Sequence, residues 1–247
     1  MSSKLGLNLT RYYSNNFDLP KREKNKIIFI ILHYTGMKKE SEAIKKLCDN
    51  KSKVSSHYFI KNNGEVLNLV PDLYTAWHAG ESYWKKFRSL NKYSIGIEIN
   101  NPGHDHGYEK FTSKQISSLS KLLKYLIKRY NIKKKNVLGH SDIAPNRKKD
   151  PGEKFPWKKL AKKNLCYWHN LDVNKIKRYR SMSLKNYEEK IFFKNIQNIG
   201  YVRLYENKVK NKKVNLVKAF QRKFRQDLIN GKIDKECFLI SKNLLKL

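Results

Sequence analysis

A short loop near the middle of the chain collects residue types that bind metals and stabilise negative charge. The run 139–152 contains the imidazole of His140, the carboxylate of Asp150 and the ammonium group of Lys148, and it closes with Pro-Gly. His33 follows an apolar run earlier in the chain. Imidazole and carboxylate are good Zn²⁺ ligands, and three protein ligands leave a fourth position for water. These residues indicate a mononuclear zinc hydrolase, but their spacing is not the HExxH helix signature.

Glu98 is a second candidate for chemistry. It lies among the apolar residues Ile95, Ile97 and Ile99, which are typical of a buried strand. An isolated buried carboxylate is costly, so such an acid is either paired or functional. As a general base it would take a proton from the attacking water and later return it to the leaving amine. A structural salt bridge is the alternative, and it forms easily in so basic a chain.

The candidate groups lie on or directly after runs that predict strands. The apolar, β-branched run 27–32 predicts a buried central strand with His33 at its carboxyl end, where catalytic groups commonly project into a cleft. Asn63-Gly64 predicts the tight turn of a hairpin. The expected strands are residues 27–32, 57–60, 66–70, 93–99 and 137–139.

Helical patterns alternate with these strands. Thr112 and Gln115 form a capping-box signature, and apolar positions keep helical spacing from there to Tyr130. Residues 41–49 predict a shorter helix. Strands that alternate with helices predict an α/β fold with a mixed central sheet flanked by helices.

The character of the sequence changes after Trp157. Residues 158–183 are basic and irregular, and helical patterns follow at 188–199 and 214–224. We therefore expect a small all-α domain after the α/β domain. The predicted division is an N-terminal arm at 1–25, a catalytic domain at 26–160, a linker at 161–185 and the helical domain at 186–247.

The chain resembles the zinc-dependent N-acetylmuramoyl-L-alanine amidases, the family that includes peptidoglycan recognition proteins, over roughly residues 26–157. Within this family it looks most like the bacterial amidases of wall turnover and recycling. Asn146 stands where many relatives place Gly, which alters a turn rather than a ligand. The resemblance is carried, in the family's order, by residues 33–35, 54–60, 77–80, 94–99 and 140–151. Residues 187–246 resemble a peptidoglycan-binding three-helix module, through residues 217–224 and 231–234.

The amidase resemblance implies a reaction and the residues that carry it. The reaction is hydrolysis of the amide between the lactyl group of N-acetylmuramic acid and L-alanine of the stem peptide. One Zn²⁺ per chain would be held by His33, His140 and Asp150, Glu98 would shuttle the proton, and Lys148 would stabilise the oxyanion. The loop 77–80 would form part of the cleft wall. The expected substrate contacts are His78, Tyr34, His57 and Ala79.

The charge balance supports an acidic partner without specifying it. Lys and Arg number 54 against 21 Asp and Glu, which gives a net charge of +33. Nucleic acid, anionic wall polymers and stem-peptide carboxylates would all fit this charge. Because the lysines are scattered over the whole chain and no nucleic-acid-binding motif is recognised, we expect no nucleic-acid partner. A non-catalytic peptidoglycan-binding protein and a structural zinc protein are further alternatives. The presence of all three expected ligands argues against the non-catalytic binding protein. The absence of a fourth protein ligand argues against the structural zinc protein.

The cysteines and the N-terminal residues give indications about the cellular compartment of the protein. Cys48, Cys166 and Cys237 are far apart and form no CxxC pair, so we expect free or buried thiols. No apolar run is long enough to span a membrane, and residues 1–7 lack a hydrophobic signal core. The wall-binding resemblance favours the bacterial envelope, whereas the missing signal and the cysteines favour the cytoplasm. We expect the envelope (periplasm), with the cytoplasm as the alternative. We expect a monomer.

Overall fold

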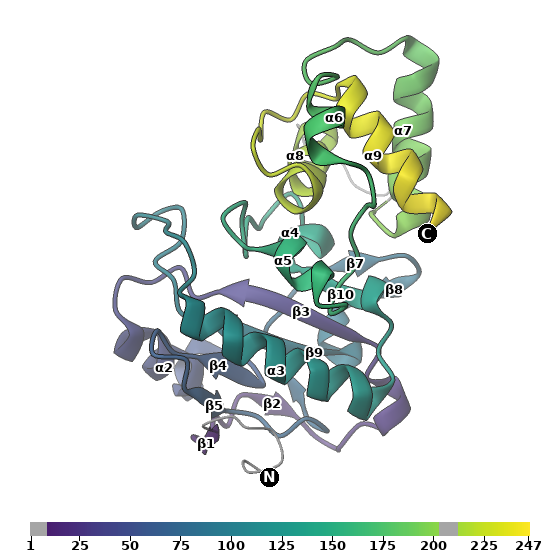
Figure 1. Ribbon diagram of the computed structural model, residues 1–247. Coiled ribbons are helices and arrows are strands. Elements are labelled where there is room, and N and C mark those ends of the chain that lie inside the picture. Colours follow the sequence, from purple (N-terminus) through teal and green to yellow (C-terminus); the bar gives the residue numbers. More distant parts are fainter. Residues whose placement is uncertain (1–8, 203–211) are drawn as a thin grey trace.

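The five expected strands pair with one strand that was not predicted, β1 in the N-terminal arm, to form one mixed six-stranded sheet. The computed structural model describes residues 9–202 and 212–247, so the first eight residues of the predicted N-terminal arm lie outside the described residues. The strand order is β1-β5-β4-β9-β3-β10, and all neighbours are parallel except β4 and β5 (Figure 1). The strands of the sheet are β1 (Leu9–Arg11), β3 (Phe29–Tyr34), β4 (Tyr58–Ile60), β5 (Val66–Asn68), β9 (Ser94–Ile99) and β10 (Val137–Gly139).

The parallel strands bring the candidate groups to one edge of the sheet. β3 and β9 pair so that His33 lies opposite Glu98, and β10 pairs with β3 so that Gly139 lies opposite Leu32. His140 is the next residue after β10. Carboxyl ends of parallel strands meet at the same edge, which is where α/β proteins place their ligands.

The two faces of the sheet are covered by different helices. Along β3, Ile30 and Leu32 join the hydrophobic cluster under α3 (Ser113–Tyr130), which crosses the sheet in Figure 1. The alternate residues of β3 face the other way, as the period of two in a strand requires. The capping box that starts α3 is formed in full: the Gln115 amide donates to Thr112 Oγ1 at 3.1 Å, and the Thr112 amide donates to Gln115 Oε1 at 2.9 Å.

Short elements complete the α/β part. The hairpin between β4 and β5 is confirmed, with Gly64 at φ +86°, a value that favours glycine. The remaining strands form two small ribbons, β2 (Phe17–Asp18) with β6 (Thr75–Ala76) and β7 (Tyr83–Trp84) with β8 (Phe87–Arg88). The other helices here are α2 (Glu40–Cys48), α4 (His140–Ile143), α5 (Trp157–Lys162) and the 3₁₀ turns η1 (Lys24–Lys26), η2 (Asn50–Ser52), η3 (Leu90–Tyr93) and η4 (Lys134–Asn136).

The C-terminal helices join a hydrophobic cluster that includes residues of the sheet. The helical unit, residues 186–247, contains α7 (Asn186–Ile199), α8 (Lys212–Phe224) and α9 (Lys235–Lys246), drawn in green and yellow in Figure 1. Phe29 and Ile31 of β3 and Leu138 of β10 share one hydrophobic cluster with Phe192 of α7 and Phe220 of α8. The helical unit and the sheet therefore share a core.

The segment predicted as an irregular linker is folded. It contains α6 (Val173–Lys177), and Leu165, Cys166 and Ile176 are buried. The sequence pattern missed this packing because these apolar residues keep neither a helical nor a strand period.

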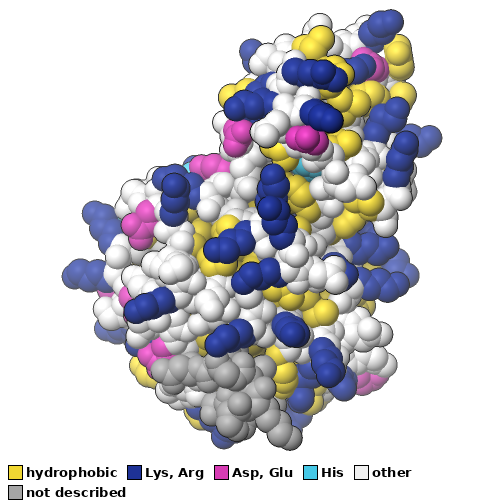
Figure 2. Space-filling view, in the orientation of Figure 1, with side chains coloured by type: hydrophobic (Ala, Val, Ile, Leu, Met, Phe, Trp, Pro, Cys, Tyr) yellow, Lys and Arg dark blue, Asp and Glu magenta, His cyan; other side chains and the backbone are white. Residues whose placement is uncertain are grey.

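The expectations on cysteines and surface charge agree with the structure. Cys48, Cys166 and Cys237 are free thiols, and the last two are buried. Figure 2 shows Lys and Arg side chains spread over the visible face rather than gathered in one patch. Within residues 9–202 and 212–247, no helix combines the length and apolar character needed to cross a membrane.

Candidate active site

Three side-chain atoms from two segments far apart in sequence converge at the carboxyl edge of the sheet. His33 Nδ1 lies 2.9 Å from His140 Nδ1, and Asp150 Oδ2 lies 3.0 Å from each of these nitrogens. All three side chains are buried. His33 comes from β3, His140 from the start of α4, and Asp150 from ten residues further along the same segment. We call residues 139–155 the ligand loop.

This triangle of donor atoms fits a Zn²⁺ ion. In a tetrahedral site with metal–ligand bonds of about 2.0 Å, neighbouring ligand atoms lie about 3.3 Å apart. The observed spacings of 2.9–3.0 Å are only slightly shorter. Two imidazoles and a carboxylate are also donors that zinc prefers. Among the described residues, this is the one group of three or more His, Cys, Asp and Glu side chains with such geometry.

A chain of hydrogen bonds leaves the Nδ1 lone pair of His33 free for a metal. The Ser94 hydroxyl donates to the Leu90 carbonyl at 2.7 Å, so Ser94 Oγ accepts from His78 Nε2 at 3.1 Å. His78 Nδ1 is then unprotonated and accepts from His33 Nε2 at 3.0 Å. The proton of His33 is thus on Nε2, which leaves Nδ1 as the ligand atom.

His140 is oriented in the same way by the main chain. Its Nε2 donates to the carbonyl of Ala79 at 3.0 Å, which leaves Nδ1 without a proton and directed at Asp150. The amide of Ser141 donates to the carbonyl of Asp150 at 2.8 Å, so the two ligand-bearing ends of the segment are tied together.

The ionisation states suit metal binding. Burial and the neighbouring His140 lower the pKa of His33 to about 4, so the imidazole is neutral near pH 7. Burial raises the pKa of Asp150, but contacts with His140 and His33 outweigh it and hold that pKa well below its usual range. A neutral imidazole and an ionised carboxylate are the forms that bind metal.

Glu98 lies beside the triangle as an unpaired acid. Its Oε2 is buried and has no hydrogen-bond partner among the described residues. Burial, with a further contribution from Asp150, raises the pKa of Glu98 to about 8, against the opposing effect of Lys148 and Lys46. No salt bridge neutralises this carboxylate in the described part of the chain, which favours a functional role over a structural one.

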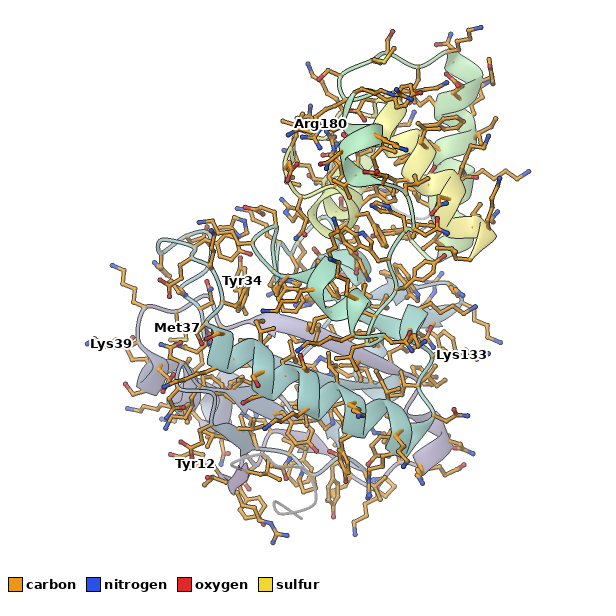
Figure 3. All side chains as sticks on the ribbon, viewed as in Figure 1. Tyr12, Tyr34, Met37, Lys39, Lys133 and Arg180 are labelled. Carbon is orange, nitrogen blue, oxygen red and sulfur yellow. The ribbon has the colours of Figure 1, made fainter. Side chains whose placement is uncertain are left out.

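Lys148 lines the same cleft as the triangle and Glu98. The cleft has a volume of about 480 Å³, and its walls also include Lys46 of α2, Trp77 and Tyr34. Two of the cleft residues, Tyr34 and Met37, are labelled in Figure 3 and lie near each other at the carboxyl edge of the sheet. The positive charge of Lys148 acts to lower the pKa of both His33 and Glu98. The arrangement offers a metal position, a proton carrier and a cation within one cavity.

Comparison with known proteins agrees with this chemistry. The family model described as N-acetylmuramoyl-L-alanine amidase (Amidase_2) matches residues 23–153, more than half of the chain. The chain belongs to this family. The amidase is 34% identical to N-acetylmuramoyl-L-alanine amidase AmiD of Escherichia coli over 235 residues, which covers 90% of this chain and 83% of AmiD. It therefore hydrolyses the amide between N-acetylmuramic acid and L-alanine, and its family is zinc-dependent.

Two solved structures resemble the amidase over nearly its whole length. AmiD from E. coli, solved as a complex with anhydro-N-acetylmuramic acid-L-Ala-D-gamma-Glu-L-Lys, has a TM-score of 0.78 and 33% identity, covering 90% of this chain and 89% of that one. AmpDh3 from Pseudomonas aeruginosa, in complex with anhydromuramic pentapeptide, also has a TM-score of 0.78, with 30% identity and coverage of 94% and 96%. These matches confirm the predicted mixed sheet with a C-terminal helical unit.

The structure places two of the expected substrate contacts away from the cleft. His57 is fully buried away from the cleft: the Gly96 amide donates to its Nδ1 at 3.0 Å, and its Nε2 lies 3.0 Å from the Tyr74 carbonyl. Ala79 is also fully buried, and its carbonyl orients His140. His78 borders the cleft, and its two ring nitrogens contact His33 and Ser94, so it supports a ligand; its contact with substrate stays a prediction. Of the four, Tyr34 and His78 line the cleft.

Sequence reasoning also missed a polar cluster at the rim of the cleft. In the Gly-rich loop 102–107, His104 Nδ1 lies 2.8 Å from the Tyr34 hydroxyl and its Nε2 lies 3.1 Å from Glu153. Its ring stacks on Tyr108 at a centroid distance of 4.4 Å. The contacts join segments far apart in sequence, so no local signal marks them.

Proposed function

We propose that the amidase binds one Zn²⁺ through His33 Nδ1, His140 Nδ1 and Asp150 Oδ2, and that it acts on soluble anhydro-muropeptides. The observation that carries the metal assignment is the triangle itself, in which both imidazoles already give their outer nitrogen protons to other partners. The substrate form is supported by the ligands of the two similar structures, which are an anhydromuramoyl tripeptide and an anhydromuramic pentapeptide. Intact wall polymer is the alternative substrate.

The residues around this position divide the work of hydrolysis. A bound Zn²⁺ would supply Lewis acidity toward the scissile carbonyl and make water more acidic. Glu98 takes a proton from the attacking water and delivers it to the nitrogen of L-alanine as the amide bond breaks. Lys148 places positive charge near the carbonyl oxygen, which becomes negative in the tetrahedral intermediate. The raised pKa of Glu98, about 8 in the metal-free site, suits a group that both accepts and returns a proton near neutral pH.

The helical unit is informative about the cellular compartment in which the reaction takes place. Residues 187–246 resemble a peptidoglycan-binding module, which supports the cell envelope as the compartment. We propose that this unit also contacts wall material while the cleft hydrolyses shorter products.

The experiment that tests the proposal is mass spectrometry of two substrates incubated with the protein. Purified anhydro-muropeptides and intact sacculi are each incubated with the protein as purified, after chelation, and after Zn²⁺ is restored. We expect free stem peptide from the muropeptide, loss of this product on chelation, and its return with Zn²⁺. Release of stem peptide from sacculi alone would contradict the proposal that the substrate is a soluble muropeptide. If zinc-loaded protein cleaved neither substrate, the protein would be interpreted as one that only binds peptidoglycan.

A further inference from the structure

Helix α8 of the helical unit contacts the start of the ligand loop. Lys223 Nζ donates to the carbonyl of Val137 at 3.1 Å and to Asp142 Oδ2 at 2.9 Å. Asp142, two residues after His140, also accepts from the Tyr201 hydroxyl at 2.7 Å and from the Gly139 amide at 2.8 Å. One carboxylate thus joins the backbone before His140 to two side chains of the helical unit.

The residues just after α8 contact the other end of the same loop. Gln226 Nε2 donates to the carbonyls of Glu153 and Phe155, at 2.6 and 2.7 Å. His140 and Asp150 lie between this contact and the Lys223 contact, and the amide of Ser141 donates to the Asp150 carbonyl between them. The segment that presents two of the three expected ligands is therefore held at both ends by one short stretch of the helical unit.

The contact between Lys223 and Asp142 is buried. Lys223 is 3% exposed and Asp142 is 1% exposed. The ammonium group also lies 4.5 Å from the centre of the ring of Trp157, a residue of α5 in the α/β part. Removing one partner of such a pair leaves the other charge buried and unpaired, so the remaining group must move or be hydrated. Either change displaces the backbone that carries His140.

We propose that the helical unit is a positioning part of the catalytic site, in which Lys223 and Tyr201 act through Asp142 to hold His140 in its ligand geometry. The inference rests on the zinc site proposed above. It gives the helical unit a role in the reaction itself, beyond any contact with the wall.

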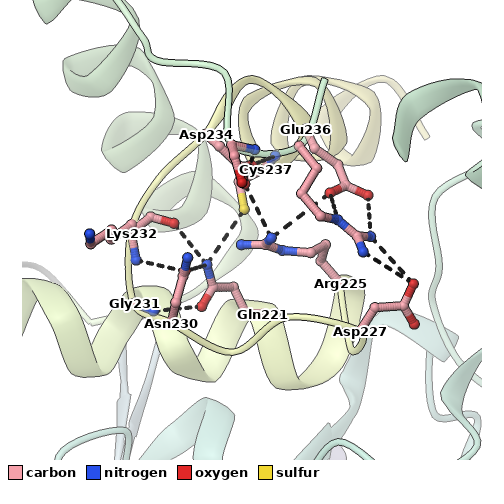
Figure 4. A network of polar contacts seen from close by, with 11 residues as sticks. Gln221, Arg225, Asp227, Asn230, Gly231, Lys232, Asp234, Glu236 and Cys237 are labelled. Atoms are coloured by element: carbon pink, nitrogen blue, oxygen red, sulfur yellow. Dashed lines mark hydrogen bonds and ion pairs between the residues drawn. The ribbon is translucent and has the colours of Figure 1, made fainter. Parts of the chain in front are cut away.

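The same stretch of chain supplies a matched control. Arg225 is another buried cation, but its partners belong to the helical unit: Asp234 at 3.1 Å and Glu236 at 3.9 Å (Figure 4). Substitution of Arg225 disturbs the packing of the helical unit without removing a contact to the ligand loop. A purely structural role of the helical unit would make Lys223 and Arg225 variants behave alike.

The test compares full-length Lys223→Met, Tyr201→Phe and Arg225→Met with the parent protein. Zn²⁺ affinity is measured by competition with a chromogenic chelator. The values of kcat and KM are measured with an anhydro-muropeptide as substrate, and Tm is measured by calorimetry. We expect Lys223→Met to weaken Zn²⁺ binding about tenfold, as loss of a group that supports metal ligands typically does. Its kcat falls while KM changes by less than about twofold. Arg225→Met lowers Tm and leaves Zn²⁺ affinity and kcat unchanged.

Tyr201→Phe keeps the inference testable if Lys223→Met does not fold, because it removes only one hydroxyl. We expect a smaller loss of Zn²⁺ affinity, and no further loss when Tyr201→Phe is combined with Asp142→Asn, since both act through one carboxylate. Parental Zn²⁺ affinity and kcat in Tyr201→Phe and in any folded Lys223→Met protein would overturn the inference. Absence of Zn²⁺ binding by the parent protein would instead overturn the zinc site.

Discussion

His33 and His78 are joined ring to ring by a hydrogen bond of 3.0 Å between His33 Nε2 and His78 Nδ1. The rings meet edge to face, with an interplanar angle of 78°. His78 in turn contacts Ser94, whose hydroxyl is anchored to the Leu90 carbonyl. A second histidine therefore fixes both the tautomer and the direction of the first, and it does so without a place among the three converging ligand atoms.

Loss of the His78 ring will weaken metal binding. We expect His78→Ala to lower Zn²⁺ affinity about 10–100-fold, because His33 then loses the acceptor that holds its proton on Nε2. Gly96→Ala gives a second route to the same effect, since a Cβ there would lie 2.4 Å from His78 Cγ. Chelator competition measures the affinity, with the exposed His106→Ala as control. Parental affinity in both variants would show that His78 does not orient the ligand.

Substitution of Glu98 will separate catalysis from metal binding. We expect Glu98→Gln to keep one Zn²⁺ per chain and to lower kcat about 10²–10⁴-fold, the range typical of a lost general base. Single-turnover cleavage of an anhydro-muropeptide and metal analysis of the same sample measure the two effects. The exposed Glu109→Gln is the matched control for charge. Near-parental turnover by zinc-loaded Glu98→Gln would exclude Glu98 as the proton carrier.

The buried carboxylate of Glu98 also predicts a pH-dependent stability of the metal-free protein. Burial raises its pKa from 4.5 to about 8, so between these values the folded state holds a proton that the unfolded state has lost. Stability then falls as pH rises through this window, and the loss is complete above the folded-state pKa. Glu98→Gln cannot lose this proton, so its Tm relative to the parent should rise from about pH 5 to about pH 9 in chelator. A Tm difference independent of pH would contradict the raised pKa.

Patterns local in sequence predicted most of the fold, and the family resemblance implied the three residues that converge. The apolar run before His33, the capping box at Thr112 and the turn at Gly64 depend on neighbouring residues, and each forms as expected. His33 and His140 are 107 residues apart in the sequence, and the parallel pairing of β3 with β10 brings them together. Because βα connections place strand ends at one edge, this convergence follows from element order alone.

The errors concern which way a side chain faces and what covers it. His57, like His33, lies in a motif of the amidase family, but it is buried behind the cleft and bonded to main-chain atoms of Gly96 and Tyr74. Lys223 looks like an ordinary helix lysine in a chain of net charge +33, and its burial against Asp142 depends on docking between segments 81 residues apart. Neither fact has a signal within a short window of sequence.

Adjacent lysines in the ligand loop allow a direct test of oxyanion stabilisation. Both lysines line the cleft, but Lys148 is half-buried and its charge acts on His33 and Glu98, whereas Lys149 is exposed and lies 3.9 Å from Asp105. We expect Lys148→Met to lower kcat about 10²–10³-fold, the usual cost of losing one group that stabilises an oxyanion. Lys149→Met has the same change of charge one residue away and should keep parental kcat. If the two variants lose activity equally, the effect comes from the general field of the basic loop, and Lys148 has no specific place at the developing oxyanion.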